Sequence, residues 1–200
     1  VRIIRAGEHI QHIPGWGMTV RESGVAVATS NWWEVPGKTC VAAYQPKGAA
    51  SYAASLVNLA NPGTYDATLG PNAGAPDWGS STGWHLDNTH WFTTGVLAQG
   101  TWSIICRIGS YTESGGQNAF GHAAGNGFAV GPYWYGARVY GSNGGENAIA
   151  PKAPQDSVLC LAGKKVYVDG TDWGFNLPGT ATNQPVCIPD DAGTFRMNGL

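Results

Sequence analysis

Apolar and polar residues alternate over short runs along much of this chain, and turn-forming residues separate one run from the next. The clearest run is residues 101–108 (TWSIICRI), in which only Ile105 breaks the alternation. Its apolar face holds Trp102, Ile104, Cys106 and Ile108. Short strands separated by Gly-rich turns indicate an all-β fold rather than an α/β fold, and we expect an antiparallel two-sheet jelly-roll sandwich.

The same pattern predicts further strands. Residues 157–173 (SVLCLAGKKVYVDGTDW) predict a strand, a turn and a second strand, followed by Asp169-Gly170, a dipeptide typical of hairpin turns. Other strands are expected at residues 39–44, in two runs of residues 83–97 around an Asp87-Asn88 turn, and in two runs of residues 120–140.

One short helix is expected among these strands. Residues 49–59 (AASYAASLVNL) are rich in Ala, and Asn61-Pro62-Gly63 follows them and would end the helix. Residues 70–83 are dense in Gly, Pro, Asn and Asp, and we expect them to form a loop.

The first part of the chain differs from the rest. Residues 24–29 (GVAVAT) are strand-like, and Asn31-Trp32-Trp33 leads into a Pro36-Gly37 turn. We expect residues 1–37 to form an N-terminal arm that packs on the domain or on a neighbouring chain. Residues 38–200 are expected to form one laminin-G-like β-sandwich domain, for the reasons given below.

The composition favours a binding or structural role. Thirty of the 200 residues are glycine and nine are tryptophan, whereas only 12% are charged. Glycine suits tight turns, and Trp and Tyr suit both cores and binding surfaces because each joins an apolar ring to a polar tip. The net charge is −2 and the basic residues are scattered, so we expect no nucleic-acid partner. No run of about 18 apolar residues occurs, so no membrane insertion is expected.

Four cysteines are spread along the chain without a C-x-x-C pair or zinc-finger spacing. They are Cys40, Cys106, Cys160 and Cys187, and three of the four lie in apolar strand-like runs. Because a domain of this length buries enough surface to fold without cross-links, we expect free thiols in preference to disulfides.

Several motifs resemble one known family when they are taken in order. They are Tyr65-Asp66-Ala67-Thr68, GWHLD at 83–87, HWFTTGV at 90–96, KVYVDG at 165–170 and TFRMNGL at 194–200. This series resembles the concanavalin A-like, laminin-G-type jelly roll and covers residues 38–200. Residues 40–66 are similar to the version found in tail-fibre and other virion proteins of bacteriophages.

The resemblance implies a function and a location. We expect a non-catalytic structural or receptor-binding module of a phage-like virion, located on the virion or extracellularly. Such a module would associate with itself or with other virion subunits and bind host-surface glycans. The alternative is a free carbohydrate-binding protein or a glycan-degrading enzyme of the same fold.

The resemblance also implies an open sheet edge. In the family the Phe-x-x-Gly-Leu segment continues into a last strand, whereas this sequence stops at Leu200. An edge left without that strand would expose main-chain donors and acceptors. We expect the N-terminal arm or a strand from another subunit to cover it, and we favour the second.

No arrangement in the sequence fits a catalytic centre. Residues 79–83 (GSSTG) match the nucleophile-elbow motif, but that motif needs a helix after it and a strand-like run follows, so we interpret it as a turn. Glycosidases need two carboxylates about 5–9.5 Å apart, and no suitably spaced acidic cluster occurs. Asp169 and Asp172 flank a hairpin turn, and Asp190-Asp191 would point to opposite faces of a strand. We therefore expect no enzymatic activity.

Metal ligands are also sparse. His9 and His12 are one helical turn apart, but a third ligand is missing, so we expect packed or solvated histidines. Some laminin-G-like domains bind calcium, and by that resemblance Asp87 and Asp156 are conceivable ligands. Such a site needs about six to eight oxygens, most of which a sequence does not reveal. Calcium is left open and no cofactor is assigned.

Aromatic residues outside the core are the most informative sign of a binding site. The tryptophans expected in the core, because they lie in strand patterns, are Trp84, Trp91 and Trp102. Tyr133-Trp134-Tyr135 cannot all face inward, because successive strand side chains alternate, and Asp172-Trp173 lies just past a turn. The candidate ligand-binding residues are therefore Tyr133, Trp134, Tyr135, Asp172 and Trp173. Such rings suit sugars and also suit subunit interfaces, and both interpretations stay open.

Overall fold

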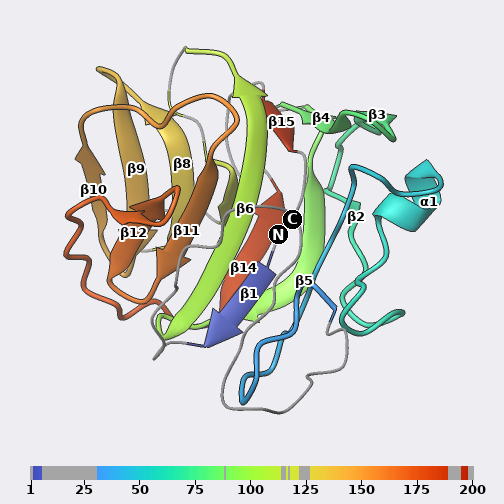
Figure 1. The fold of residues 1–200 in the computed structure, drawn as a ribbon, viewed down its shortest axis with the longest axis horizontal. Coiled ribbons are helices and arrows are strands. Elements are labelled where there is room, and N and C mark those ends of the chain that lie inside the picture. The colour runs from blue at the N-terminus through green and yellow to red at the C-terminus, as the bar shows by residue number, and fades with distance from the viewer. Residues whose placement is uncertain are drawn as a thin grey trace, which may run out of the picture.

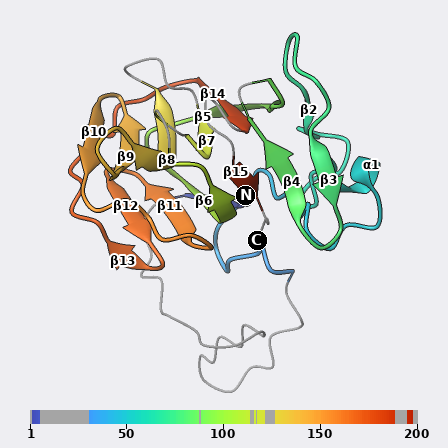
Figure 2. The same ribbon diagram turned by 90° about the horizontal axis from the view of Figure 1, so that it is seen from above.

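Two antiparallel sheets pack face to face in the computed structural model of the chain (Figure 1, Figure 2). The structure describes residues 2–5, 31–87, 89–113, 116, 118–121, 127–188 and 195–197. Strands dominate this part of the chain, and its one helix, α1 (Tyr52–Ser55), is a single turn. The expected all-β, antiparallel fold with one short helix is therefore confirmed.

Sheet 1 is ordered β13-β12-β11-β6-β15-β4-β3, and β1 also pairs with β6. Its strands are β1 (Arg2–Arg5), β3 (Asp77–Gly79), β4 (Gly83–Leu86), β6 (Trp102–Tyr111), β11 (Val158–Ala162), β12 (Lys165–Val168), β13 (Thr171–Asp172) and β15 (Phe195–Met197).

Sheet 2 is ordered β10-β9-β8-β7-β14-β5-β2. Its strands are β2 (Thr68–Leu69), β5 (Phe92–Ala98), β7 (Phe120–Gly121), β8 (Phe128–Trp134), β9 (Arg138–Asn143), β10 (Glu146–Ile149) and β14 (Gln184–Ile188). Figure 2 shows the layers edge on, with β11, β12 and β6 in one and β8, β9 and β10 in the other.

β6 is the centre of sheet 1. One of its edges pairs with β11, and its other edge is shared by two strands from distant parts of the chain. β1 pairs with residues 102–105 and β15 pairs with residues 108–111, so the two lie end to end. The first strand of the arm thus covers part of the β6 edge within the same chain. Residues 24–29, expected to form another strand, lie outside the described residues.

The core lies between the sheets and follows the predicted alternation in β6. Ile104, Cys106 and Ile108 are fully buried, and Trp102 packs against them. Ile105, which breaks the alternation, pairs with Cys160 on the opposite face. The fully buried aromatic residues of the core are Tyr44, Trp84, Phe92, Phe120, Phe128, Tyr140 and Phe175. Each such side chain contributes about 1.5–3 kcal/mol on burial, so this layer is the main source of stability.

The hairpin predicted at Asp169-Gly170 and the turns predicted at Asp87 and at residues 79–83 are confirmed. β11, β12 and β13 follow one another as the sequence indicates, and Asp169 and Gly170 have φ of 49° and 80°, the left-handed conformation that glycine adopts without strain. β4 and β5 flank the expected turn at Asp87, which bridges to His90. Residues 80–82 join β3 to β4, so the GSSTG motif forms a turn, as interpreted from the sequence.

The strand predicted at residues 39–44 is wrong, because an asparagine side chain binds this segment. Among residues 39–44 only Ala43 forms a bridge. Asn58 Oδ1 accepts from Ala43 N (2.9 Å), and Asn58 Nδ2 donates to Val41 O (3.1 Å) and Thr64 O (2.8 Å). Asn58 thereby satisfies main-chain groups that a neighbouring strand would otherwise pair.

The helix predicted at residues 49–59 is much shorter than expected. Ser51 caps α1, since its Oγ accepts from Ala54 N at 3.1 Å. Asn58 N then donates to Asp66 Oδ1 (2.8 Å) instead of extending the helix. A segment of this length is a marginal helix by itself, so competing side-chain acceptors end it after one turn.

Three smaller differences separate prediction from structure. Residues 120–140 contain β7, β8 and the start of β9 rather than two strands, and β3 lies within the loop predicted at residues 70–83. Trp91 is half-buried outside the core, with its ring against Gly70, where a Cβ would come within 2.3 Å of it. Trp84 is fully buried in the core as predicted, whereas Trp102 is partly buried and packs against the core.

The cysteines are free thiols, as the sequence analysis favours. Cys106, Cys160 and Cys187 are buried in β6, β11 and β14, whereas Cys40 is partly exposed. Burial raises the pKa of the Cys106 thiol to about 12, so almost no nucleophilic thiolate forms there at neutral pH.

Thiol reactivity tests this arrangement. Under native conditions an aromatic disulfide reagent is expected to react quickly at Cys40 alone, because the other thiols are buried, and to react with all four cysteines after unfolding in urea. Cys40→Ser should abolish the fast phase. A fast phase that survives in native Cys40→Ser protein would contradict the burial of the strand cysteines.

No helix in the described ranges is long and apolar enough to cross a membrane. His9, His12 and Asp190-Asp191 lie outside those ranges, so the expectations for them stay predictions.

Candidate functional site

One loop closes the end of the sandwich where the predicted aromatic residues lie. Residues 150–157 leave β10 in sheet 2 and enter β11 in sheet 1. Ala153 N donates to Pro132 O of β8 (3.0 Å), and Asp156 N donates to Gly109 O of β6 (2.9 Å), so the loop is bound to both sheets. We define the aromatic end as Tyr111, Tyr133, Tyr135, Trp173 and residues 150–153.

Tyr133 lies on the inner side of the aromatic end. It is half-buried against the core, and its ring centroid is 6.2 Å from that of Tyr111. The Tyr111 hydroxyl donates to Ala153 O. Burial, with the nearby charges of Glu113 and Tyr133 adding to it, raises the pKa of Tyr111 to about 12. The hydroxyl therefore stays protonated at neutral pH and continues to hold the loop.

Trp173 follows β13 of sheet 1 and reaches the same loop as Tyr111 of β6. Its ring packs against the core, and its Nε1 donates to Pro151 O (3.3 Å). The preceding Asp172 accepts from Gly174 N (2.8 Å) and pairs with Lys165, with Nζ and Oδ2 3.3 Å apart. Asp172 thus orients the segment that carries Trp173.

The turn between β8 and β9 carries the most exposed ring. Tyr135 is 61% exposed, more than any other large hydrophobic residue among those described. Trp134 and Arg138 pair in register across this turn, and Arg138 Nε and Nη2 both donate to Tyr135 O (2.9 and 2.7 Å). The turn is therefore held by hydrogen bonds while it presents Tyr135 to solvent.

The structure brings some of the predicted site residues together. Trp173 binds the loop directly, Tyr133 lies against Tyr111, which binds the same loop, and Tyr135 lies on the turn that follows β8. Asp172 has an orienting role, and Trp134 is placed here only by its main-chain register. The sequence analysis missed Pro151 and Arg138. A lone cation just after an aromatic triplet is a usable signal for Arg138, whereas the contact of Pro151 depends on how the sheets pack.

Carboxylates near this end are bound to protein donors. Asp156 forms a two-bond pair with Arg107 (Nε–Oδ1 3.1 Å, Nη2–Oδ2 2.9 Å), and Glu113 pairs with Lys152. No group of three or more His, Cys, Asp and Glu residues in the described part of the chain is placed to hold a metal ion.

The two aspartates considered as calcium ligands lie apart in the sheet. Asp87 follows β4 and Asp156 precedes β11, with β15 and β6 between them. Asp87 Oδ1 accepts from Thr89 N (2.7 Å) and Thr89 Oγ1 (2.8 Å) and lies 2.7 Å from His90 Nδ1. Burial alone would raise the pKa of Asp87, but the hydrogen bonds from Thr89 and His90 outweigh it and lower the pKa below its usual value.

Comparison of the chain with protein-family models, with curated proteins and with solved structures found no match.

Proposed function

We propose that this chain is a non-catalytic module that binds saccharides at the aromatic end. One observation carries the proposal: Tyr111 and Trp173 both bind a loop that main-chain hydrogen bonds hold to both sheets, and the ring of Tyr133 from sheet 2 lies against Tyr111. Aromatic rings offer flat apolar surfaces, and sugar rings have apolar C–H faces that can lie on them. Because the loop is already fixed, binding costs less ordering of the chain.

The proposal extends to a setting, a structural or receptor-binding part of a phage-like virion that contacts host-surface glycans. Its support is the series of motifs that resembles the concanavalin A-like jelly roll and its phage tail-fibre version. The two packed antiparallel sheets, in which about half of the neighbouring strand pairs join strands that are not consecutive in sequence, are compatible with that jelly-roll topology.

Assembly with other subunits is also part of the proposal. One edge of β1 pairs with β6, and no strand in the described residues pairs with the other edge of β1. Such an edge offers main-chain donors and acceptors to a further strand. A strand from another copy or another virion subunit would pair with these main-chain groups.

The alternatives differ in whether the ligand is cleaved. A free carbohydrate-binding protein would use the same rings, whereas a glycan-degrading enzyme needs two carboxylates about 5–9.5 Å apart across the bond. At the aromatic end Glu113, Asp156 and Asp172 each pair with a cation, which favours binding without cleavage. Polysaccharide cleavage that disappears when one acidic residue is replaced would overturn the non-catalytic proposal.

Tyr135→Ala and Trp173→Ala are each expected to weaken saccharide binding at least about tenfold, since a central aromatic contact is worth about 2 kcal/mol. A glycan array identifies a binder, and titration calorimetry then measures its dissociation constant for each variant. Tyr135 is the cleaner site, because its ring is mainly in solvent and its loss should leave the fold intact.

Tyr65→Ala is the matched control. Tyr65 is also an exposed tyrosine, at 43%, but it lies beside Gly95 of β5 and outside the aromatic end. Its replacement should leave the dissociation constant unchanged. Equal losses at Tyr65 and Tyr135, or binding that neither affects, would place the site elsewhere.

A further inference from the structure

Arg138 differs from Arg107, Lys152 and Lys165 in the group that it binds. Three described cations pair with carboxylates: Arg107 with Asp156, Lys152 with Glu113 and Lys165 with Asp172. Arg138 has no carboxylate partner in the part of the chain that the structure describes, and its guanidinium instead binds the main-chain oxygen of Tyr135. Its positive charge is therefore held in place without being neutralised.

The two hydrogen bonds from Arg138 to Tyr135 O leave other N–H donors of the guanidinium available to a ligand. A guanidinium carries five N–H groups, and the two bonds to Tyr135 O use Nε and one side of Nη2. The edge formed by Nη1 and Nη2 remains, and two parallel donors on this edge match the two oxygens of a carboxylate. The anchor also fixes the side chain, so less freedom is lost when a ligand binds.

We propose that the saccharide bound at the aromatic end is acidic, and that its carboxylate pairs with Arg138 while a sugar ring contacts Tyr135. This inference rests on the proposed function, because it names the ligand class of the same site. The net charge of −2 gives no general attraction for anions, so selectivity for an acidic sugar has to come from a local cation.

The test compares one oligosaccharide in two forms. Oligogalacturonate and its methyl ester share a sugar backbone, but only the first has free carboxylates. Wild-type protein is expected to bind the acid at least about tenfold more tightly than the ester, because a hydrogen bond to a charged group contributes about 1.5–3 kcal/mol. Added salt should weaken binding of the acid and leave binding of the ester unchanged.

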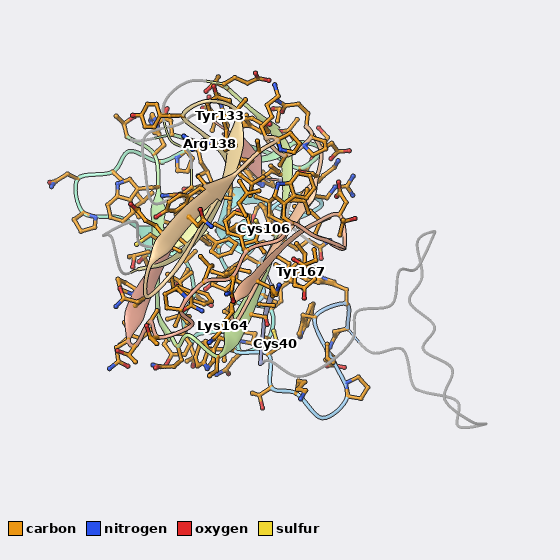
Figure 3. The ribbon with its side chains drawn as sticks, turned by 90° about the vertical axis from the view of Figure 1, so that its left-hand side faces the viewer. Cys40, Cys106, Tyr133, Arg138, Lys164 and Tyr167 are labelled. Atoms are coloured by element: carbon orange, nitrogen blue, oxygen red, sulfur yellow. The ribbon has the colours of Figure 1, made fainter. Side chains whose placement is uncertain are left out.

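Three variants locate the effect. Arg138→Gln should remove the preference for the acid, because the loss of the charge affects the acid alone, whereas the loss of the bonds to Tyr135 O weakens both forms to a similar extent. Circular dichroism shows whether the variant is folded. Arg138→Lys should lose most of the preference although the charge is kept, because lysine lacks the planar pair of donors. Lys164→Gln changes the net charge equally at the opposite end of the sandwich, as Figure 3 shows, and should leave both affinities unchanged.

The possible results distinguish the role of Arg138 from the existence of a saccharide site. If the acid and the ester bind equally and Tyr135→Ala weakens both, the proposed role of Arg138 is contradicted and the saccharide site is supported. An equal loss in Arg138→Gln and Lys164→Gln would show an effect of net charge and overturn the inference. A lack of binding by both forms, together with no binder on a glycan array, would overturn both.

Discussion

Replacing Asn143 by leucine is expected to lower the free energy of unfolding by about 3 kcal/mol or more. Asn143 is fully buried at the end of β9, and its side chain binds three separate segments. Its Nδ2 donates to Gly100 O (2.8 Å) and Gly163 O (2.5 Å), and its Oδ1 accepts from Ala181 N (3.2 Å). Leucine would leave these main-chain groups without a partner, and each such loss costs about 1–3 kcal/mol.

Urea unfolding followed by circular dichroism measures this effect, and the melting temperature should fall by about 6–12 °C for a chain of this length. Asn147→Ala is the control, because Asn147 is exposed on the adjacent strand β10 and accepts only from the neighbouring Ala148 N (2.8 Å). That change should cost less than about 0.5 kcal/mol. A similar cost for both variants would mean that Asn143 does not hold the three segments together.

Gly121→Ala is expected to be destabilising by about 2–5 kcal/mol, from strain and overlap together. A Cβ at this position would lie 2.1 Å from Phe128 O and 2.5 Å from Ala129 Cα, both main-chain atoms of β8. Gly121 also has φ of 113°, which other residues rarely adopt. β7 joins β8 to β14 and so links the two halves of sheet 2.

Gly170→Ala distinguishes backbone strain from steric overlap as causes of the loss of stability. Gly170 has φ of 80° but no atom lies within 4 Å of the position of a Cβ, so only backbone strain is added there, about 1–2 kcal/mol. Chemical unfolding of both variants should therefore show a clearly larger loss for Gly121→Ala. Equal losses would mean that β7 does not pack against β8 as closely as the structure has it.

The sequence predicts strands well where one face is buried. In β6 the alternation alone places Ile104, Cys106 and Ile108 inside, because period-two patterning is a direct result of one buried face. The hairpin at Asp169-Gly170 is equally predictable, since that dipeptide favours the left-handed turn conformation. Both signals are local, and they do not depend on which strands pair.

Prediction fails where a distant side chain decides the local structure. Residues 39–44 have strand-like composition, but Asn58 takes their main-chain groups, and the same residue helps to end α1 early. The shared edge of β6 is also beyond sequence reasoning, because β1 and β15 come from opposite ends of the chain. Neither arrangement leaves a signal in a short window of sequence.

The candidate site also has one part that the sequence predicts and another that depends on how the sheets pack. Alternation along the strand predicts that the aromatic triplet cannot all be buried, and Tyr135 is indeed the exposed ring. The meeting of Trp173 with Pro151 and of Tyr111 with Ala153 requires both sheets to be in place. The turn residue Asp169 likewise binds Val158 N (2.8 Å), which its position in the hairpin alone would not indicate.

The most direct test of a saccharide site at the aromatic end is to map the binding surface by NMR. Isotope-labelled protein is titrated with the oligosaccharide that binds best on the array, and amide shifts are followed residue by residue. The expected result is that the largest shifts fall on residues 133–138, 150–153 and 172–173. Shifts centred elsewhere, such as on the β3–β4 hairpin or around Tyr65, would contradict the proposed site.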